Sequence, residues 1–92
     1  MIFKSNSEKN QILARDRGIT FEEIVQKIAS GAKVIETDHP NHKKYPNQKI
    51  LIVDVEGYAY LVPFVIDEEG YFLKTIIPSR KATRKYLGGK NG

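Results

Sequence analysis

The chain has 92 residues, of which 40% are hydrophobic, and its formal net charge at pH 7 is +4. This length supports one hydrophobic core, so we expect a single domain over residues 1–92, with 88–92 as a frayed tail. The absence of cysteine excludes disulfides, thiolate metal clusters and cysteine nucleophiles, and the first residues contain neither a secretory signal nor a membrane-spanning stretch. We therefore expect a cytoplasmic protein without membrane contacts.

The first residues predict a short strand followed by a helix. Ile2 and Phe3 can form the strand. Ser5 and Glu8 then have the spacing of a capping box, in which two side chains bind the free amides at a helix start. The helix should end near Gly18, because glycine readily adopts the left-handed conformation of a helix C-terminus.

The second helix has the clearest signals in the sequence. Thr20 and Glu23 form another capping box, and Ile19 and Ile24 occupy the two positions of a hydrophobic staple. Apolar residues repeat at helical spacing as far as Gly31, where the helix should end. One face of this helix must therefore be buried.

The remainder of the chain predicts a sheet. Val34 and Ile35 suggest a short strand, and a polar loop, Thr37–Gln48, follows. Three longer runs rich in β-branched and aromatic residues come next: Ile50–Val55, Tyr58–Ile66 and Tyr71–Ile77. Tight turns between them predict sequential antiparallel pairing, with a bulge or an unpaired position at Pro63. We expect an α+β fold in which two N-terminal helices cover one face of a four-stranded antiparallel meander.

A basic helix should complete the fold. Pro78 ends the last strand, and Ser79 caps a helix that runs to about Leu87, with Ala82 and Tyr86 toward the sheet. From Ser79 onward there are no acids and five cations, which are Arg80, Lys81, Arg84, Lys85 and Lys90. Such a local basic block indicates a polyanion or an acidic protein as partner.

Helical spacing places the cations of this segment in two adjacent rows. Arg80 lies above Arg84, and Lys81 lies above Lys85. The free amides of the helix start, together with Ser79 and Arg80, would form a seat for a phosphate. The alternative interpretation is a solvated basic helix whose charges only keep the protein soluble.

The polar loop contains a second candidate group. His39, His42, Lys43 and Tyr45 lie within seven residues. Histidine can transfer protons near neutral pH and lysine can stabilise charge on phosphorus, so the group suits RNA cleavage without a metal or another cofactor. As a metal site the loop is weak, because Asp38 is the only further ligand nearby. An ordinary surface loop is the other interpretation.

The strands also contain aromatic residues that could stack on nucleic-acid bases. They are Tyr58, Tyr60, Phe64, Tyr71 and Phe72. Their alternation along the strands favours packing in the core over base stacking.

Three segments have a combined pattern that is typical of one protein family. They are the pair Lys9-Asn10, the segment Gly18–Ile24, and the basic segment Ser79–Tyr86 with its Arg-Lys-Ala-Thr-Arg sequence. In these segments and in the order of its elements the chain resembles the BrnT-type toxins of bacterial toxin–antitoxin systems. The resemblance implies a fold like that of the RelE group of ribonuclease toxins. It also implies RNA cleavage, and a cognate antitoxin, of ribbon-helix-helix type, that represses the shared promoter.

The resemblance also implies roles for individual residues. Arg80, Thr83 and Arg84 match the basic C-terminal motif of the family and would bind phosphate. The family often has a histidine where this chain has Arg17, whose guanidinium stays charged near neutral pH. Proton transfer would then need His39 or His42, or cleavage would depend on phosphate stabilisation alone.

The sequence thus favours a metal-independent endoribonuclease toxin of the mRNA interferase type. The catalytic candidates are Arg80, Arg84, His42, His39, Lys43 and Tyr45, and the RNA- and phosphate-binding candidates are Ser79, Lys81, Thr83, Lys85, Arg17 and Arg15. The expected partners are RNA, the antitoxin, and operator DNA only through the antitoxin complex. One alternative is a non-catalytic basic module that docks an acidic antitoxin or nucleic acid, and another is a regulator that binds operator DNA alone.

Overall fold

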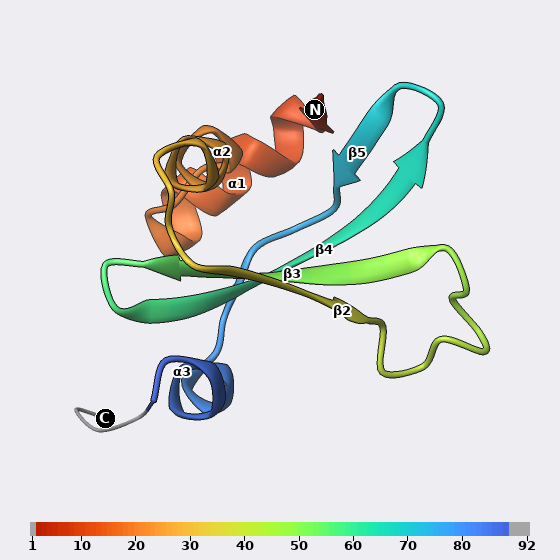
Figure 1. Ribbon diagram of the computed structural model, residues 1–92. Coiled ribbons are helices and arrows are strands. Elements are labelled where there is room, and N and C mark those ends of the chain that lie inside the picture. Colours follow the sequence, from red (N-terminus) through yellow and green to blue (C-terminus); the bar gives the residue numbers. More distant parts are fainter. Residues whose placement is uncertain (1, 89–92) are drawn as a thin grey trace.

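The elements follow the order β-α-α-β-β-β-β-β-α in the computed structural model, which describes residues 2–88 (Figure 1). They are β1 (Phe3–Ser5), α1 (Ser7–Arg17), α2 (Phe21–Ala29), β2 (Val34–Asp38), β3 (Gln48–Val55), β4 (Tyr58–Asp67), β5 (Gly70–Leu73), β6 (Ile77–Pro78) and α3 (Arg80–Tyr86). Lys90, and the expected tail from residue 89 onward, lie outside the described residues.

The strands form a mixed sheet in the order β1-β5-β4-β3-β2, with β6 paired to β4. The antiparallel meander from β2 to β5 was expected; tight turns join β3, β4 and β5, whereas the loop 39–47 joins β2 to β3. The expectation of a purely antiparallel, four-stranded sheet was wrong, because β1 pairs with β5 in parallel, with Phe3 opposite Tyr71. This pairing joins segments far apart in the chain, and no local sequence signal specifies such a contact.

Helix α1 begins one residue later than the capping-box pattern indicated. The side chain of Asn6, not Ser5, accepts a hydrogen bond from the amide of Lys9 at 3.0 Å. Ser5 belongs to β1 and pairs with Leu73, so its backbone is already committed to the sheet. The end at Gly18 is confirmed, since this residue has a φ of 66° and its amide bonds back into the helix.

Helix α2 confirms its sequence signals. The Thr20 side chain accepts from the amide of Glu23 at 3.2 Å, as an N-cap should. Ile19 and Ile24, the predicted staple, are 3% and 0% exposed, so both belong to the core. Gly31, with a φ of 95°, follows the helix end as predicted.

The run Tyr71–Ile77 is divided between two strands instead of forming one. β5 pairs with residues 64–67 of β4, and β6 pairs with residues 60 and 61 of the same strand. Pro63 lies where β4 changes partner, and its carbonyl accepts from the Lys74 amide at 2.8 Å. The N and O atoms of one strand residue point to the same side, so the missing N–H of Pro63 removes no bond to β3. The β3–β4 register passes Pro63 without a bulge.

The sheet has helices on both faces, contrary to the expectation of a single covered face. Figure 1 shows α1 and α2 on one side and α3 on the other. Strand β3 explains this arrangement, because Ile50–Val53 is apolar and buried throughout. Leu51 and Val53 pack with the core under α1 and α2, whereas Ile50 and Ile52 pack with Ala82 of α3. Among the described helices, none has the length and apolar character needed to cross a membrane.

Candidate nucleic-acid interface

Two hydroxyl groups fix the start of α3, one by capping the helix and one by binding β4. Ser79 Oγ accepts from the Ala82 amide at 3.0 Å. Thr83 Oγ1 accepts from the Ala59 amide and donates to the Ser79 carbonyl, with both distances 2.8 Å. Ser79 and Thr83 were phosphate-binding candidates, but their hydroxyls are engaged in positioning the helix. The first-turn amide of Ala82 is likewise taken, so the expected phosphate seat at the helix start loses this donor.

The end of α3 is held by a lysine from before β2. Lys33 Nζ donates to the carbonyl of Tyr86 at 2.7 Å, where a cation also meets the negative end of the helix. Ala82 is 6% exposed, and Tyr86 and Leu87 pack against the same cluster, as the sequence predicted. The helix is therefore fixed at both ends and along its buried face.

These contacts leave the four cations of α3 on the outer surface. Arg80, Lys81, Arg84 and Lys85 are all exposed. Among the described residues, none of the four forms an ion pair. Lys85 Nζ lies 5.2 Å from the ring centroid of Tyr86. We call these four residues the cationic face of α3; its charges are available to an anionic partner.

The histidine loop, residues 39–47, has local order of its own. The rings of His39 and Tyr45 are in contact, with centroids 4.8 Å apart, and His39 Nδ1 accepts from the Asn41 amide at 3.0 Å. His42 and Lys43 are exposed. The loop thus groups His39 with Tyr45, while His42 and Lys43 face solvent.

The structure does not bring this loop and α3 into one site. The loop joins β2 to β3 at Gln48, whereas α3 binds Ala59, which pairs with Asp54 at the other end of β3. Six residues of strand separate Gln48 from Asp54, which corresponds to about 20 Å. Figure 1 shows the loop and α3 well apart. Sequence spacing could not reveal this separation, because it depends on the length and direction of β3.

The two arginines of α1 lie apart from the cationic face of α3 as well. Arg15 Nε lies 3.1 Å from Asp16 Oδ1, so its charge is partly compensated. Arg17 donates from its guanidinium to the carbonyl of Ile76, a buried residue of the core under α1 and α2. Helix α1 covers the face of the sheet opposite α3.

The strand aromatics divide between the two faces of the sheet. Phe64 and Tyr71 stack in the core under α1 and α2, with centroids 4.9 Å apart, as the alternation predicted. Tyr58 and Tyr60 contact each other on this same face. Phe72 is the exception, since it pairs with Val65 on the face that carries α3.

A pocket of about 320 Å³ lies between α2, β1 and β5. Helix α2 covers the face of the sheet opposite α3, so the pocket is separate from the cationic face of α3. Its walls are mainly apolar, with Lys4 and Glu22 among the polar residues. Asn10 donates to Glu22 at 2.7 Å, and this hydrogen bond lowers the pKa of the Glu22 carboxyl. The lining contains neither histidine nor arginine. Within residues 2–88, no cluster of three or more potential metal ligands occurs.

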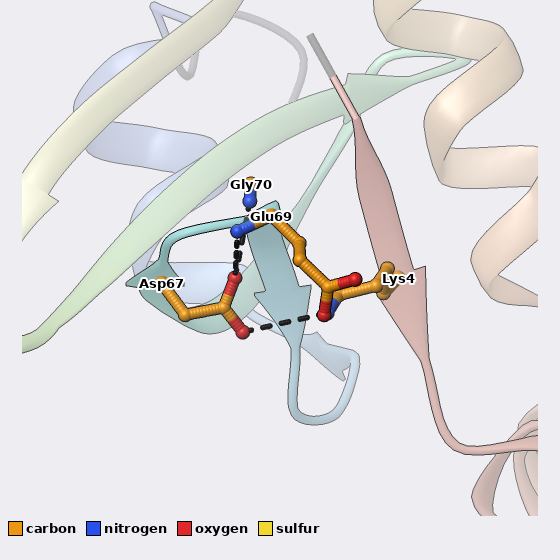
Figure 2. A network of polar contacts seen from close by, with 4 residues as sticks. All are labelled: Lys4, Asp67, Glu69 and Gly70. Carbon is orange, nitrogen blue, oxygen red and sulfur yellow. Dashed lines mark hydrogen bonds and ion pairs between the residues drawn. The ribbon is translucent and has the colours of Figure 1, made fainter.

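A polar network fastens β1 to the turn between β4 and β5 (Figure 2). Lys4 Nζ lies 2.6 Å from Glu69 Oε1 and 3.5 Å from Asp67 Oδ2. Asp67 Oδ1 also accepts from the amides of Glu69 and Gly70. The Glu69 amide, with Lys4, lowers the pKa of Asp67, and the hydrogen bond to Glu69 raises the pKa of Lys4. This network stabilises the parallel β1–β5 pairing.

No family model, curated protein or solved structure matches the chain.

Proposed function

We propose that the chain is the toxin of a bacterial toxin–antitoxin pair and that it binds and cleaves RNA at the cationic face of α3. The supporting observation is that four exposed cations occur within a seven-residue helix held rigidly on the sheet. A single strand of RNA presents a regular row of phosphates, and a fixed row of Lys and Arg side chains is suited to neutralise them.

The family resemblance supports the toxin assignment and a RelE-like fold. The segments that resemble BrnT-type toxins lie in α1, at the start of α2 and in α3. Each has a defined structural role here: Asn10 accepts a hydrogen bond from the Phe21 amide, Thr20 caps α2, and Thr83 anchors α3.

Cleavage at this face depends on Arg80 and Arg84. The histidine loop lies about 20 Å away along β3 and so belongs to another part of the surface. In the proposed reaction the RNA 2′-hydroxyl attacks the adjacent phosphate, and the two arginines stabilise the charge that develops on its oxygens. The bond between phosphorus and the 5′-oxygen breaks as the bond to the 2′-oxygen forms. Water accepts the proton of the 2′-hydroxyl and donates a proton to the leaving 5′-oxygen, so the products are a 2′,3′-cyclic phosphate and a 5′-hydroxyl. The reaction needs no metal.

The separation of the histidine loop from α3 favours a second candidate, a binding module that does not cut. In that case the cationic face of α3 docks an acidic antitoxin or nucleic acid, and no proton-transfer group is needed beside it. Both candidates predict that Arg80 and Arg84 determine affinity, but only the first predicts RNA fragments.

Inducible expression in bacteria separates the two candidates. The wild type is compared with Arg80→Ala plus Arg84→Ala, and with Lys43→Ala plus Lys44→Ala as a control that removes the same charge from the loop. RNA integrity and growth are followed after induction. Growth arrest with RNA fragmentation that only the arginine variant abolishes supports the nuclease.

Two outcomes would contradict it. Growth arrest with intact RNA would exclude the nuclease and leave the docking module as the function. Loss of cleavage in the loop variant alone would transfer the reaction to His39 and its neighbours.

The proposed protein partner is an antitoxin that presents acidic residues to the cationic face of α3. Operator DNA would be bound only by the complex of both proteins. Co-expression with the neighbouring reading frame tests this: the arginine variant should lose co-purification, and the loop variant should retain it.

A further inference from the structure

We infer that Phe72 and Lys74 form a base-stacking position for single-stranded RNA, on the sheet face that also carries α3. This inference rests on the proposed RNA binding, and it assigns a site to the bases, whereas the cationic face of α3 binds the phosphates.

The first observation concerns the part of the sheet that α3 leaves uncovered. The helix is short and packs near the β3–β4 turn, around Ala59 and Ile52. Farther along the same face lie five partly exposed, uncharged side chains, which are Thr37, Gln48, Pro63, Val65 and Phe72. Lys4, opposite Phe72 on β1, and Asp67 lie on this face as well and are paired with each other. The face therefore offers an uncharged strip of sheet, with an ion pair at one edge, beside the basic helix.

The second observation is the combination of an aromatic ring and a free cation on that strip. Phe72 differs from Phe64 and Tyr71, which stack in the opposite core. Lys74 Nζ lies 5.4 Å from the Phe72 ring centroid, and Lys74 is exposed. Proteins that bind single-stranded nucleic acid use this combination, with a base stacked on the ring and the cation against the backbone.

The spacing from Phe72 to α3 suits a short length of RNA. Phe72 pairs with Val65, and Thr83 bonds to Ala59, six residues away on the same strand β4. Six strand residues span about 20 Å. At about 3.4 Å per stacked nucleotide, about six nucleotides cover this distance. One strand of RNA of that length can therefore reach Phe72 and α3 together.

The charges around Phe72 are compatible with an anionic ligand. Asp67 and Glu69, two acids at the β4–β5 turn, are both paired with Lys4, which lies opposite Phe72 on β1. Lys74 forms no ion pair among the described residues, so its charge is available.

A tryptophan substitution provides a direct test, because the chain contains no tryptophan. Phe72→Trp places a single indole at the proposed position. Tyr58→Trp is the matched control, an exposed aromatic on the opposite face. Both full-length variants are titrated with a 2′-O-methyl oligouridylate, which lacks the attacking hydroxyl and cannot be cleaved. The base should quench the emission of Phe72→Trp and leave that of Tyr58→Trp unchanged, and inorganic polyphosphate should quench neither.

Affinity measurements give a second readout. Phe72→Leu keeps an apolar side chain but removes the ring, and we expect it to weaken oligouridylate binding about 5- to 100-fold. Its binding to inorganic polyphosphate, which has no bases, should stay within twofold, and Tyr58→Leu should bind both ligands like the wild type. Circular dichroism confirms that each variant is folded.

The outcomes separate this inference from the proposed function. In one outcome the wild type binds the oligouridylate, Arg80→Ala plus Arg84→Ala abolishes this binding, and the emission of Phe72→Trp is not quenched. The stacking position is then wrong, and RNA binding at α3 stands. Equal losses of oligouridylate and polyphosphate binding in Phe72→Leu would also overturn it. If the wild type binds no oligouridylate, both the stacking position and RNA binding fail.

Discussion

Thr83 and Ala59 are joined by a 2.8 Å hydrogen bond that links the basic helix to β4, near its turn with β3. Ala59 is fully buried, so its amide has no access to bulk water. The bond therefore positions every cation of α3 relative to the open sheet face.

Removal of the Thr83 hydroxyl should destabilise the fold. Thr83→Val has nearly the same shape but leaves the Ala59 amide without a partner, which costs about 1–3 kcal/mol of unfolding free energy. Thr83→Ser keeps the hydroxyl and should lose less than half as much. Urea denaturation measures both values. Equal stability of Thr83→Val and the wild type would show that water or another acceptor replaces the hydroxyl.

Gly70 should tolerate no side chain. Its φ is +134°, and an added Cβ would overlap the carbonyl oxygen of Ile2, which accepts from the Tyr71 amide. Gly57, with a φ of +88°, has open space around it, so Gly57→Ala costs only the left-handed backbone strain of about 1–2 kcal/mol. Gly70→Ala should lower the melting temperature clearly more than Gly57→Ala. The reverse order would contradict the close approach of β1 to β5.

The Lys4–Asp67 network should make stability depend on pH in the acid range. The pKa of Asp67 is lowered in the folded state from its ordinary value of 3.8, so its contribution is complete above that value. The contribution is lost as the pH falls through the lowered pKa. Because the pair is exposed, the effect should be small. Asp67→Asn should flatten the melting-temperature profile below about pH 4, and Glu68→Gln, which removes an acid outside the network, should not.

The pKa of Lys4 is raised from 10.5, so its contribution has the opposite dependence. The contribution is complete below that value and is lost only as the pH rises through the raised pKa. Lys4→Met should therefore destabilise equally from pH 6 to 9. A difference in stability between Lys4→Met and the wild type that varies with pH within this window would contradict the raised pKa of Lys4.

The salt dependence of RNA binding should identify the phosphate contacts. For single strands each neutralised phosphate contributes about 0.7 to the slope of log affinity against log salt. Arg80→Ala plus Arg84→Ala should reduce the slope for the 2′-O-methyl oligouridylate by about 1.4. Lys43→Ala plus Lys44→Ala should leave it unchanged. Equal reductions would mean that the protein attracts RNA through its overall charge.

Some features were predictable because they depend on neighbouring residues in the chain. The boundaries of α2 follow from Thr20 and Gly31, and the cation rows of α3 follow from helical spacing. The antiparallel pairing of β3, β4 and β5 follows from turns too short to permit another connection. The resemblance to BrnT-type toxins likewise came from the linear sequence and stays a prediction.

Other features were decided by contacts between distant segments. The parallel pairing of β1 with β5 is one such feature. The position of α3 on the second face is another, since Ile50 and Ile52 need a cover on that side. The same long-range packing separated the histidine loop from Arg80 and Arg84, and left Phe72 as the one aromatic residue of the described strands on the sheet face that carries α3. The sequence by itself determined which residues carry charge and where α2 and α3 begin and end, because these are local properties. Only the tertiary structure decided which of them share a surface, because that depends on which strands pair and which face each helix covers.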